Sequence, residues 1–393
     1  MRIRLKDAFD LQMGKTPARN TPSYWDGNHK WISIADIGSA GKYIATTKER
    51  ITDKAITESG IRAVPAHTVI MSFKLSIGKT AITSEEMYTN EAIMAFISNG
   101  TYAIDTDYLY HMCCGTAWTE GTNKAVMGLT LNKATLSEKR ISLPEITEQR
   151  NIAAKFDALD NVIEKTQSEL SSLDQLVKSR FVEMFGAPIT NKMGWPCLSL
   201  VKTCKAILGG GTPSKSHPEY FTGGIPWVSP KDMKYAVISD SIDHITEEAV
   251  AHSTTNLVPK NSVLMVIRSG ILKHTLPVAI NSVPVTINQD MKAFVPGNGV
   301  ITEFLMYYFK AIESDVLAGV RGVTADNIDF KAFQQRTIIV PPLELQNRFA
   351  AFVAEVDKSK FSIQKSLSTS RKLWTLARID VIMNMDFSTQ RSL

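Results

Sequence analysis

Two short segments carry the residue types that end a phosphate-binding loop, because residues 14–16 and 78–80 are both Gly-Lys-Thr. Such a loop also needs a glycine five residues before its final glycine, and Phe9 and Phe73 occupy those two positions. The Asn/Asp-Pro-Pro-aromatic tetrapeptide typical of amino-methyltransferases is absent, and the Asp and His residues form no obvious metal cluster. The sequence therefore predicts that this chain performs no catalysis by itself and holds no metal ion.

The composition is that of a globular protein. Lys and Arg number 44 against 39 Asp and Glu, which gives the 393 residues a net charge of +5. Hydrophobic residues make up 44% and charged residues 21%, too apolar a balance for global disorder. No run of eighteen apolar residues is present, and the first fifteen residues lack the apolar stretch of a signal peptide. We expect a cytoplasmic protein of two or three domains that does not enter the membrane.

The chain is a duplication. At a constant offset of 196 residues, nine positions of segment 14–36 carry the same residue types in segment 210–232. The nine pairs are Gly14/Gly210, Thr16/Thr212, Pro17/Pro213, Pro22/Pro218, Tyr24/Tyr220, Gly27/Gly223, Trp31/Trp227, Ser33/Ser229 and Asp36/Asp232. With small insertions the match continues to Pro144 and Gln149, which correspond to Pro341 and Gln346. Two copies therefore fill the whole chain.

Each copy starts with about 145 residues rich in Gly, Pro and Thr, with short β-branched runs such as residues 68–73 and 262–267. Runs of this kind, bounded by Pro, Gly and Asn, predict strands in a mixed or mainly β domain. Residues 302–312 add a predicted helix. We therefore predict an α+β protein with two mixed, mainly β domains in a pseudo-twofold arrangement.

The pattern then changes, because residues 145–185 and 343–393 contain neither Pro nor Gly. Apolar residues recur there in alternating steps of four and three, as in helices that pack along a seam. The predicted helix-packing residues are Ile152, Phe156, Leu159, Ile163, Leu170, Leu173, Val177, Phe349, Val353, Val356, Ile363, Leu367 and Trp374. Each helix of ~40 residues spans roughly 60 Å. We predict that the two helices form an antiparallel coiled coil that separates the β domains, with a parallel or intermolecular pairing as the alternative.

The small positive charge lies outside the helices. Residues 147–186 and 343–386 together hold 12 basic and 12 acidic residues, whereas residues 1–146 and 187–342 each carry a net charge of +2. This distribution fits DNA-binding domains on a neutral scaffold, because phosphate contacts need Lys and Arg. An ordinary solvated surface explains so small an excess nearly as well.

The combined pattern resembles the specificity subunit of type I restriction–modification systems. The resemblance rests on the segment GGTPSKSHPEYFTGGIPWVSPKDM at residues 210–233 with its counterpart at 14–37, and on Pro-Pro-Leu-Glu-x-Gln at residues 341–346 before a long helix. In the first copy this second motif, at residues 143–149, departs at the second proline but keeps Gln149. Either motif alone is weakly specific, but both recur in order at one spacing over essentially the whole chain.

The resemblance implies two target recognition domains, residues 1–146 and 187–342, a central spacer helix at 147–186, and a distal spacer helix with a C-terminal tail at 343–393. In that family the two domains recognise the halves of a bipartite sequence in double-stranded DNA, and the paired helices set the gap. The helices also dock two methyltransferase subunits, through which the restriction/translocase subunits join. The specificity subunit is non-catalytic in that family. Its partner subunits use S-adenosylmethionine, ATP and magnesium, and the methyltransferases among them act on adenine.

Positions that differ between the copies are the best candidates for DNA contacts, since recognition domains with different half-sites share framework and vary at contacts. The loop after the central strand, which lies near DNA in the family, carries Lys74 and Lys79 in one copy and Arg268, Lys273 and His274 in the other. These side chains could bind phosphate or donate to guanine in the major groove. The remaining DNA-binding candidates are Lys15, Arg19, Lys30, Lys124, Lys215, Lys231, Lys234 and Arg321.

Two alternatives remain open from the sequence. The aromatic clusters at residues 24–31 and 220–227 could stack on bases, although aromatic residues next to Pro and Gly favour a packing role. The whole chain could also be a scaffold in which duplicated β domains bind protein or glycan and the coiled coil only spaces them.

Overall fold

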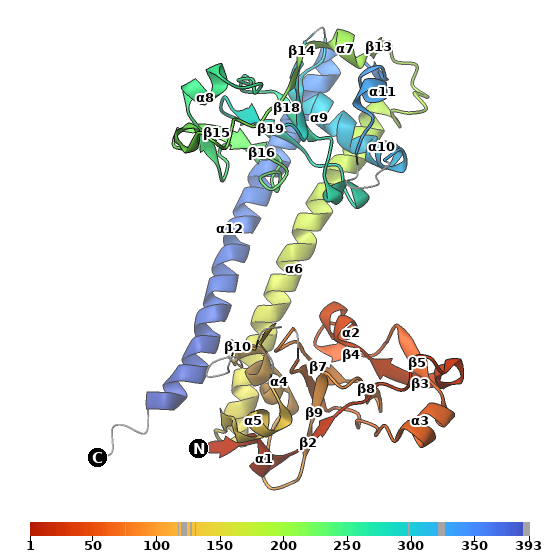
Figure 1. The fold of residues 1–393 in the computed structure, drawn as a ribbon, viewed down its shortest axis with the longest axis vertical. Coiled ribbons are helices and arrows are strands. Elements are labelled where there is room, and N and C mark those ends of the chain that lie inside the picture. The colour runs from red at the N-terminus through yellow and green to blue at the C-terminus, as the bar shows by residue number, and fades with distance from the viewer. Residues whose placement is uncertain are drawn as a thin grey trace. The chain divides into compact units, whose positions relative to one another are not determined.

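A computed structural model describes residues 1–74, 76–116, 118, 124–125, 128–129, 131–297, 299–320 and 327–387, and of residues 124–125, 128–129 and 378–387 it describes the backbone alone. It divides into two compact units (Figure 1): the first comprises Met1–Gln167 and Lys365–Leu393, and the second comprises Ser168–Gln364. Each unit holds one β-rich domain and a part of each of the two long helices, α6 (Ile146–Phe185) and α12 (Leu343–Phe387).

The domain of the first unit is built on a mixed five-stranded sheet with the strand order β2-β9-β6-β7-β4. Its strands are Phe9–Met13, Ile93–Ser98, Val69–Ser72, Thr80–Thr83 and Tyr43–Ile44. A three-stranded sheet has the order β5-β3-β8, from Glu49–Ile51, Trp25–Ile32 and Tyr88–Thr89. β1 (Arg2–Arg4) pairs with β12 (Arg140–Ser142), and β10 (Lys124–Ala125) with β11 (Gly128–Leu129). The helices are α1 (Leu5–Ala8), α2 (Ile34–Ser39), α3 (Asp53–Ser59), α4 (Thr106–Gly115) and α5 (Lys133–Glu138), with a 3₁₀ turn η1 at Pro22–Tyr24.

In its described residues, the domain of the second unit repeats the five-stranded sheet, the three-stranded sheet and the β1–β12 pair strand for strand. Its five-stranded sheet has the order β14-β21-β18-β19-β16, from Cys204–Gly209, Met291–Pro296, Val263–Val266, Val278–Asn281 and Val237–Ile238. The three-stranded sheet β17-β15-β20 comprises His244–Ile245, Ile225–Val228 and Thr286–Ile287, and β13 (Cys197–Ser199) pairs with β22 (Thr337–Ile339). The helices and turns are α7 (Leu200–Thr203), η2 (Pro218–Phe221), α8 (Glu247–Ala251), η3 (Gly270–Lys273), α9 (Thr302–Ala311), α10 (Glu313–Ala318) and α11 (Phe330–Gln334).

The sequence prediction of two mixed-sheet domains is therefore confirmed. In both five-stranded sheets the short edge strand runs parallel to its neighbour while the other pairs are antiparallel. The helix predicted at residues 302–312 is present as α9, and the first domain has a helix, α4, at the corresponding place, which was not predicted.

Repeated glycines lie where two backbones meet. A β-carbon on Gly14 would fall 2.2 Å from the carbonyl oxygen of Thr89, and one on Gly210 would fall 2.0 Å from that of Asn288. A side chain therefore does not fit at either position. The repeated tryptophans fix the same turn, because the indole of Trp31 donates to the carbonyl of Lys15 at 3.0 Å and Trp227 donates to Gly211 at 3.0 Å.

The two long helices pair in an antiparallel sense within the first unit. The indole of Trp374, late in α12, donates to Asp160, early in α6, at 2.6 Å, and Arg371 donates to Gln167 further along α6 at 3.2 Å. Trp374 also packs on a cluster that contains Ile152 and Phe156.

The helix pairing in the second unit has the same sense. Phe349, near the start of α12, packs against Phe181 and Phe185 near the end of α6, with ring centres 5.4 Å and 5.5 Å apart. Lys360 donates to Asp174 at 2.6 Å, later in α12 and earlier in α6. The antiparallel prediction is thus confirmed within each unit.

All thirteen predicted helix-packing residues are buried or half-buried. Eight are buried: Ile152, Phe156, Leu170, Val177, Phe349, Val353, Val356 and Leu367. The half-buried residues are Leu159, Ile163, Leu173, Ile363 and Trp374.

A buried glutamine joins the first β-rich domain to the start of α6. The side-chain oxygen of Gln149 accepts the backbone N–H of Asp105 at 2.9 Å, at the start of α4. Its amide nitrogen donates to the carbonyls of Ala103 at 3.1 Å and Pro144 at 2.9 Å. Gln149 is only 1% exposed, so these bonds satisfy backbone groups that water does not reach.

Gln346 makes the same three bonds at the start of α12. Its oxygen accepts the N–H of Ile301 at 3.0 Å. Its amide donates to the carbonyls of Gly299 at 2.8 Å and Pro341 at 2.7 Å, and the residue is fully buried. We call this repeated arrangement the glutamine clamp.

The aromatic packing at the start of α12 gives a stability prediction. Phe349 is 0% exposed, so Phe349→Ala should lower the free energy of unfolding by about 3–5 kcal/mol, because the lost ring leaves a cavity. Phe361, on the same helix, is 71% exposed, and Phe361→Ala should change stability by less than about 0.5 kcal/mol. Urea unfolding of both variants measures this, and equal midpoints for the two would contradict the assignment.

Candidate nucleic-acid interface

The loops that follow the two central strands present basic residues to solvent. After β6, the Lys74 ammonium lies 5.2 Å from the ring centre of Phe73, and exposed Lys79 precedes β7. After β18, Arg268 is followed by the turn η3, which ends on exposed Lys273 and is capped by exposed His274.

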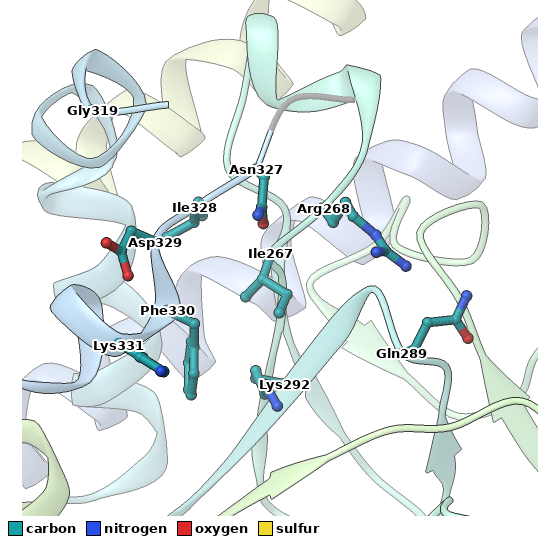
Figure 2. Close-up of a pocket in the computed structure, with 10 residues that line it drawn as sticks. All are labelled: Ile267, Arg268, Gln289, Lys292, Gly319, Asn327, Ile328, Asp329, Phe330 and Lys331. Carbon is teal, nitrogen blue, oxygen red and sulfur yellow. The ribbon is translucent and has the colours of Figure 1, made fainter. Parts of the chain in front are cut away.

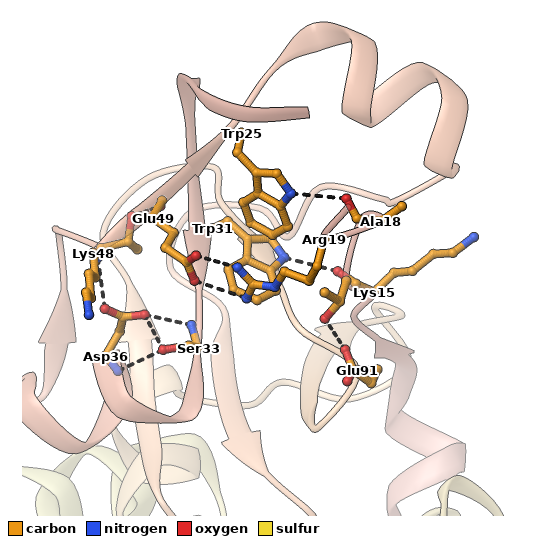
Figure 3. Close-up of polar contacts among 12 residues, drawn as sticks. Lys15, Ala18, Arg19, Trp25, Trp31, Ser33, Asp36, Lys48, Glu49 and Glu91 are labelled. Carbon is orange, nitrogen blue, oxygen red and sulfur yellow. Dashed lines mark hydrogen bonds and ion pairs between the residues drawn. The ribbon is translucent and has the colours of Figure 1, made fainter. Parts of the chain in front are cut away.

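In the first domain, Arg19 lies against the repeated tryptophans. Its guanidinium carbon is 4.0 Å from the ring centre of Trp25 and 4.9 Å from that of Trp31 (Figure 3). Both terminal nitrogens hydrogen-bond the Glu49 carboxylate. Arg19 is thus held in a fixed orientation, and a phosphate contact would compete with an existing ion pair.

Other candidates near this repeated segment also have protein partners. Lys15 donates to the carbonyl of Ser59, and Lys30 pairs with Glu85. In the second domain Lys231 donates to Asp243 at 2.5 Å.

The last candidates are Lys215 and Lys234, which are exposed in the second domain. Arg321 lies outside the described residues, and of Lys124 only the backbone, in β10, is described.

A cavity of about 870 Å³ lies beside Arg268 in the second domain (Figure 2). Its polar lining includes Gln289, Lys292, Asn327 and Lys331. The lining comes from three segments distant in sequence. Arg268 follows β18, Gln289 and Lys292 lie just before and within β21, and Asn327 and Lys331 lie just before and within α11. Sequence comparison of the copies found Arg268 but missed the others, because nothing in the sequence shows that these segments meet.

The first unit contains a polar cluster that the sequence did not reveal. Lys42 donates to both oxygens of Asp157 at 2.6 and 2.8 Å and pairs with Asp107 at 2.8 Å. The ring nitrogen Nε2 of buried His111 lies 2.8 Å from Asp157. We call these four residues the Lys42 cluster, which joins the β4 edge and α4 of the domain to α6.

Charge pairing in the Lys42 cluster outweighs burial. Burial raises the pKa of Asp157, but hydrogen bonds from Lys42 and His111 exceed this effect and hold the pKa below its ordinary value. Burial likewise lowers the pKa of Lys42, but hydrogen bonds to Asp107 and Asp157 raise it above its ordinary value. The cluster therefore favours charged Lys42 and Asp157 at neutral pH.

Within the described residues, no group of three or more His, Cys, Asp and Glu side chains has the arrangement of a metal site. A search of the same residues for a helix long and apolar enough to cross a bilayer also finds none. The fold defines a protein with two similar mixed-sheet domains, each with basic residues in the loop after its central strand.

Comparison with known proteins identifies the family. The model of the type I restriction modification DNA specificity domain matches residues 1–174 and 202–370. The chain is 41% identical to the specificity subunit of the type I restriction enzyme EcoR124I/EcoR124II of Escherichia coli, over 40% of each chain. It is 23% identical to the specificity subunit of the type I restriction enzyme MjaIX of Methanocaldococcus jannaschii, over 94% of this chain and 89% of that one.

Solved structures share the fold. A chain of a type I R-M system matches with a TM-score of 0.60 at 18% identity, over 97% of both chains. The specificity subunit of such a system from M. genitalium matches with a TM-score of 0.54 at 13% identity, over 97% of this chain and 96% of that one.

The chain belongs to the family of type I restriction–modification DNA specificity domains, and it carries two of them. It is a DNA-sequence-specificity subunit with two recognition domains, as the family resemblance of its sequence predicted, and specificity subunits are non-catalytic components of their complexes.

The Lys42 cluster gives a pH prediction. Because the pKa of Asp157 is lowered from 3.8 in the folded protein, its stabilising effect is complete above that value and is lost as the pH falls through the folded pKa. The difference in unfolding free energy between the wild type and Asp157→Asn should therefore be larger at pH 5 than at pH 3. Urea unfolding at both pH values measures it, with Asp10→Asn, at an exposed position, as the control. If the difference in unfolding free energy between the two proteins were larger at pH 3 than at pH 5, the prediction that the folded protein lowers the pKa of Asp157 would be wrong.

Proposed function

We propose that each recognition domain binds one half of a bipartite double-stranded DNA target and that the paired helices set the gap between the halves. The observation that carries this proposal is that the two domains share a framework but differ in charged residues at equivalent loops. After the central strand, one has Lys74 and the other Arg268. Shared framework with different contact residues is what two unlike half-sites require.

The helix pair supports a spacer role through its stiffness. α6 has 40 residues and α12 has 45, so the two helices have lengths of roughly 60 and 68 Å. Buried apolar residues hold the pair together in both units. A length of this order corresponds to about one and a half to two turns of DNA, at ~34–36 Å a turn.

Two methyltransferase subunits are the proposed partners of the helix pair. Seven large apolar side chains on the described parts of α6 and α12 are exposed: Val162, Leu176, Val182, Leu343, Phe361, Leu373 and Leu376. Exposed apolar residues on a stiff helical surface favour a protein contact. The restriction/translocase subunits would join through the methyltransferases, which would use S-adenosylmethionine to methylate adenine, with ATP and magnesium serving the complex.

This function places the protein in the cytoplasm, where chromosomal and incoming DNA are accessible. The alternative of a scaffold for protein or glycan has no support from the family match, which covers both β-rich domains.

Lengthening both helices tests the spacer role. Seven residues inserted after Gln167 in α6 and before Lys365 in α12 would preserve the heptad seam on either side. Methylome sequencing of a host that carries this chain with its methyltransferase should then report unchanged half-sites and a changed gap. The matched control is a seven-residue insertion into an exposed loop of the first recognition domain, next to Gly100. Methylation at the wild-type gap and rate by the lengthened protein would contradict the spacer role.

Replacing Phe361, the most exposed of the large apolar residues on the described parts of the two long helices, tests the docking surface. Phe361→Ala should weaken association with the methyltransferase by about tenfold or more, because exposed aromatic residues often dominate interfaces. Ile242→Ala, at a 64% exposed position on the second recognition domain, is the matched control. Co-purification and analytical ultracentrifugation measure the stoichiometry, and unchanged assembly of the Phe361 variant would place the contact elsewhere.

A further inference from the structure

The guanidinium of Arg268 is held by a neighbouring carboxylate. Its Nε donates to Oδ1 of Asp290 at 2.6 Å, and a terminal nitrogen lies 2.6 Å from the same oxygen. Asp290 is fixed in turn, because Asn288 donates to its other oxygen at 3.2 Å and accepts its backbone N–H at 3.1 Å. The side chain of Arg268 is nevertheless 48% exposed, so its remaining N–H groups face outward.

Donor groups surround the same opening. In Figure 2 the guanidinium points toward the Gln289 amide and away from Asp329 on the opposite side of the cavity. Lys292 lies with its ammonium 4.9 Å from the ring centre of Phe330, another lining residue. The lining thus combines cations with one flat aromatic face.

Backbone hydrogen bonds identify the equivalent positions in the first domain. The N–H of Ile267 donates to the carbonyl of Asp290 at 2.8 Å, just as the N–H of Phe73 donates to Ala92 at 2.9 Å. The strand registers agree, because Met265 lies opposite Lys292 in β18–β21 and Met71 lies opposite Met94 in β6–β9.

The two domains therefore differ chemically on one framework. Lys74 stands where the second domain has Arg268, and Ala92 stands where it has Asp290. Lys292 is replaced by Met94, which is completely buried. The held arginine and its cationic neighbour are special to the second domain, as a determinant of a particular half-site would be.

We propose that Arg268, oriented by Asp290, recognises a guanine in the half-site bound by the second recognition domain. This inference rests on the proposed DNA-binding function. Arginine donates two parallel hydrogen bonds to O6 and N7 of guanine in the major groove, which requires a fixed plane. Asp290 is the positioning residue because it fixes that plane without meeting the base.

A guanine edge fits this geometry better than a phosphate. The Asp290 carboxylate beside the guanidinium repels a phosphate and reduces the attraction that an unpaired arginine would offer. A neutral base edge does not suffer this repulsion, and it gains from donors already in place. Lys292 and Lys331 supply the positive potential that draws the DNA backbone to the same region.

The test is selection of bound sequences from a DNA library with randomised half-sites, using the full chain assembled with its methyltransferase. The variants are Arg268→Lys, which keeps the charge but loses the paired donors, and Asp290→Asn. Lys260→Gln, at an exposed position of the same domain that is no DNA-binding candidate, is the control. Arg268→Lys should lower the preference for guanine at one position by about tenfold to a hundredfold, and Asp290→Asn should lower it at the same position.

The possible outcomes distinguish a failure of the guanine assignment from a failure of the proposed DNA-binding function. If wild-type selection gives two half-sites, one with a guanine whose preference falls in both variants while the other half-site stays unchanged, the inference stands. If both half-sites appear but Arg268→Lys leaves every base preference intact, or weakens all sequences equally, the guanine assignment is overturned. If the wild type selects no sequence at all, the proposed function itself fails.

Discussion

The structure depends on one side chain used twice. A buried glutamine at the start of each long helix satisfies three backbone groups, so the recognition domain and helix cannot part without leaving those groups unpaired. An unpaired buried amide or carbonyl costs about 1–3 kcal/mol, and the clamp concentrates three such groups on each glutamine. The direction in which each domain meets its helix is therefore fixed by hydrogen bonding as well as by apolar packing.

Around this shared clamp, the two units use different chemistry. The second unit surrounds the start of α12 with aromatic rings, among them Phe181, Phe304 and Phe349. The first unit places His111 of α4 on the ring of Phe156, at 5.2 Å between ring centres, and adds the charged contacts of Lys42. Where the domain meets its helix, the second unit thus packs mainly aromatic rings, whereas the first adds the charged contacts of Lys42.

The duplication and the heptad pattern made most of the architecture predictable. The two copies, 196 to 197 residues apart in the sequence, have the same strand order in their five-stranded and three-stranded sheets. The recurrence of apolar residues in steps of four and three corresponds to two helices whose apolar side chains pack together. The repeated glycines and tryptophans proved to be framework, since Gly14 and Trp31 are needed wherever the same turn crosses the same strand. The Lys42 cluster was not predictable, because its central contact joins Lys42 to Asp157, 115 residues further along the chain, and it has no repeat partner to mark it. Which basic residues contact DNA depends on the direction of each side chain, and the periodicity of a sequence carries no information about that direction. The DNA-binding residues therefore stay predictions.

The Lys42 cluster also affects whether the first recognition domain can be exchanged for another one. A chimaera that keeps Gln149 keeps the side chain of the clamp, whose partners in the recognition domain are backbone groups in both copies of this chain. The cluster, however, draws Lys42, Asp107 and His111 from the recognition domain and Asp157 from the helix. A transplanted first domain lacking the lysine and histidine would leave the aspartate unmatched, so exchange of this half by recombination carries a compatibility requirement that the aromatic second half does not impose.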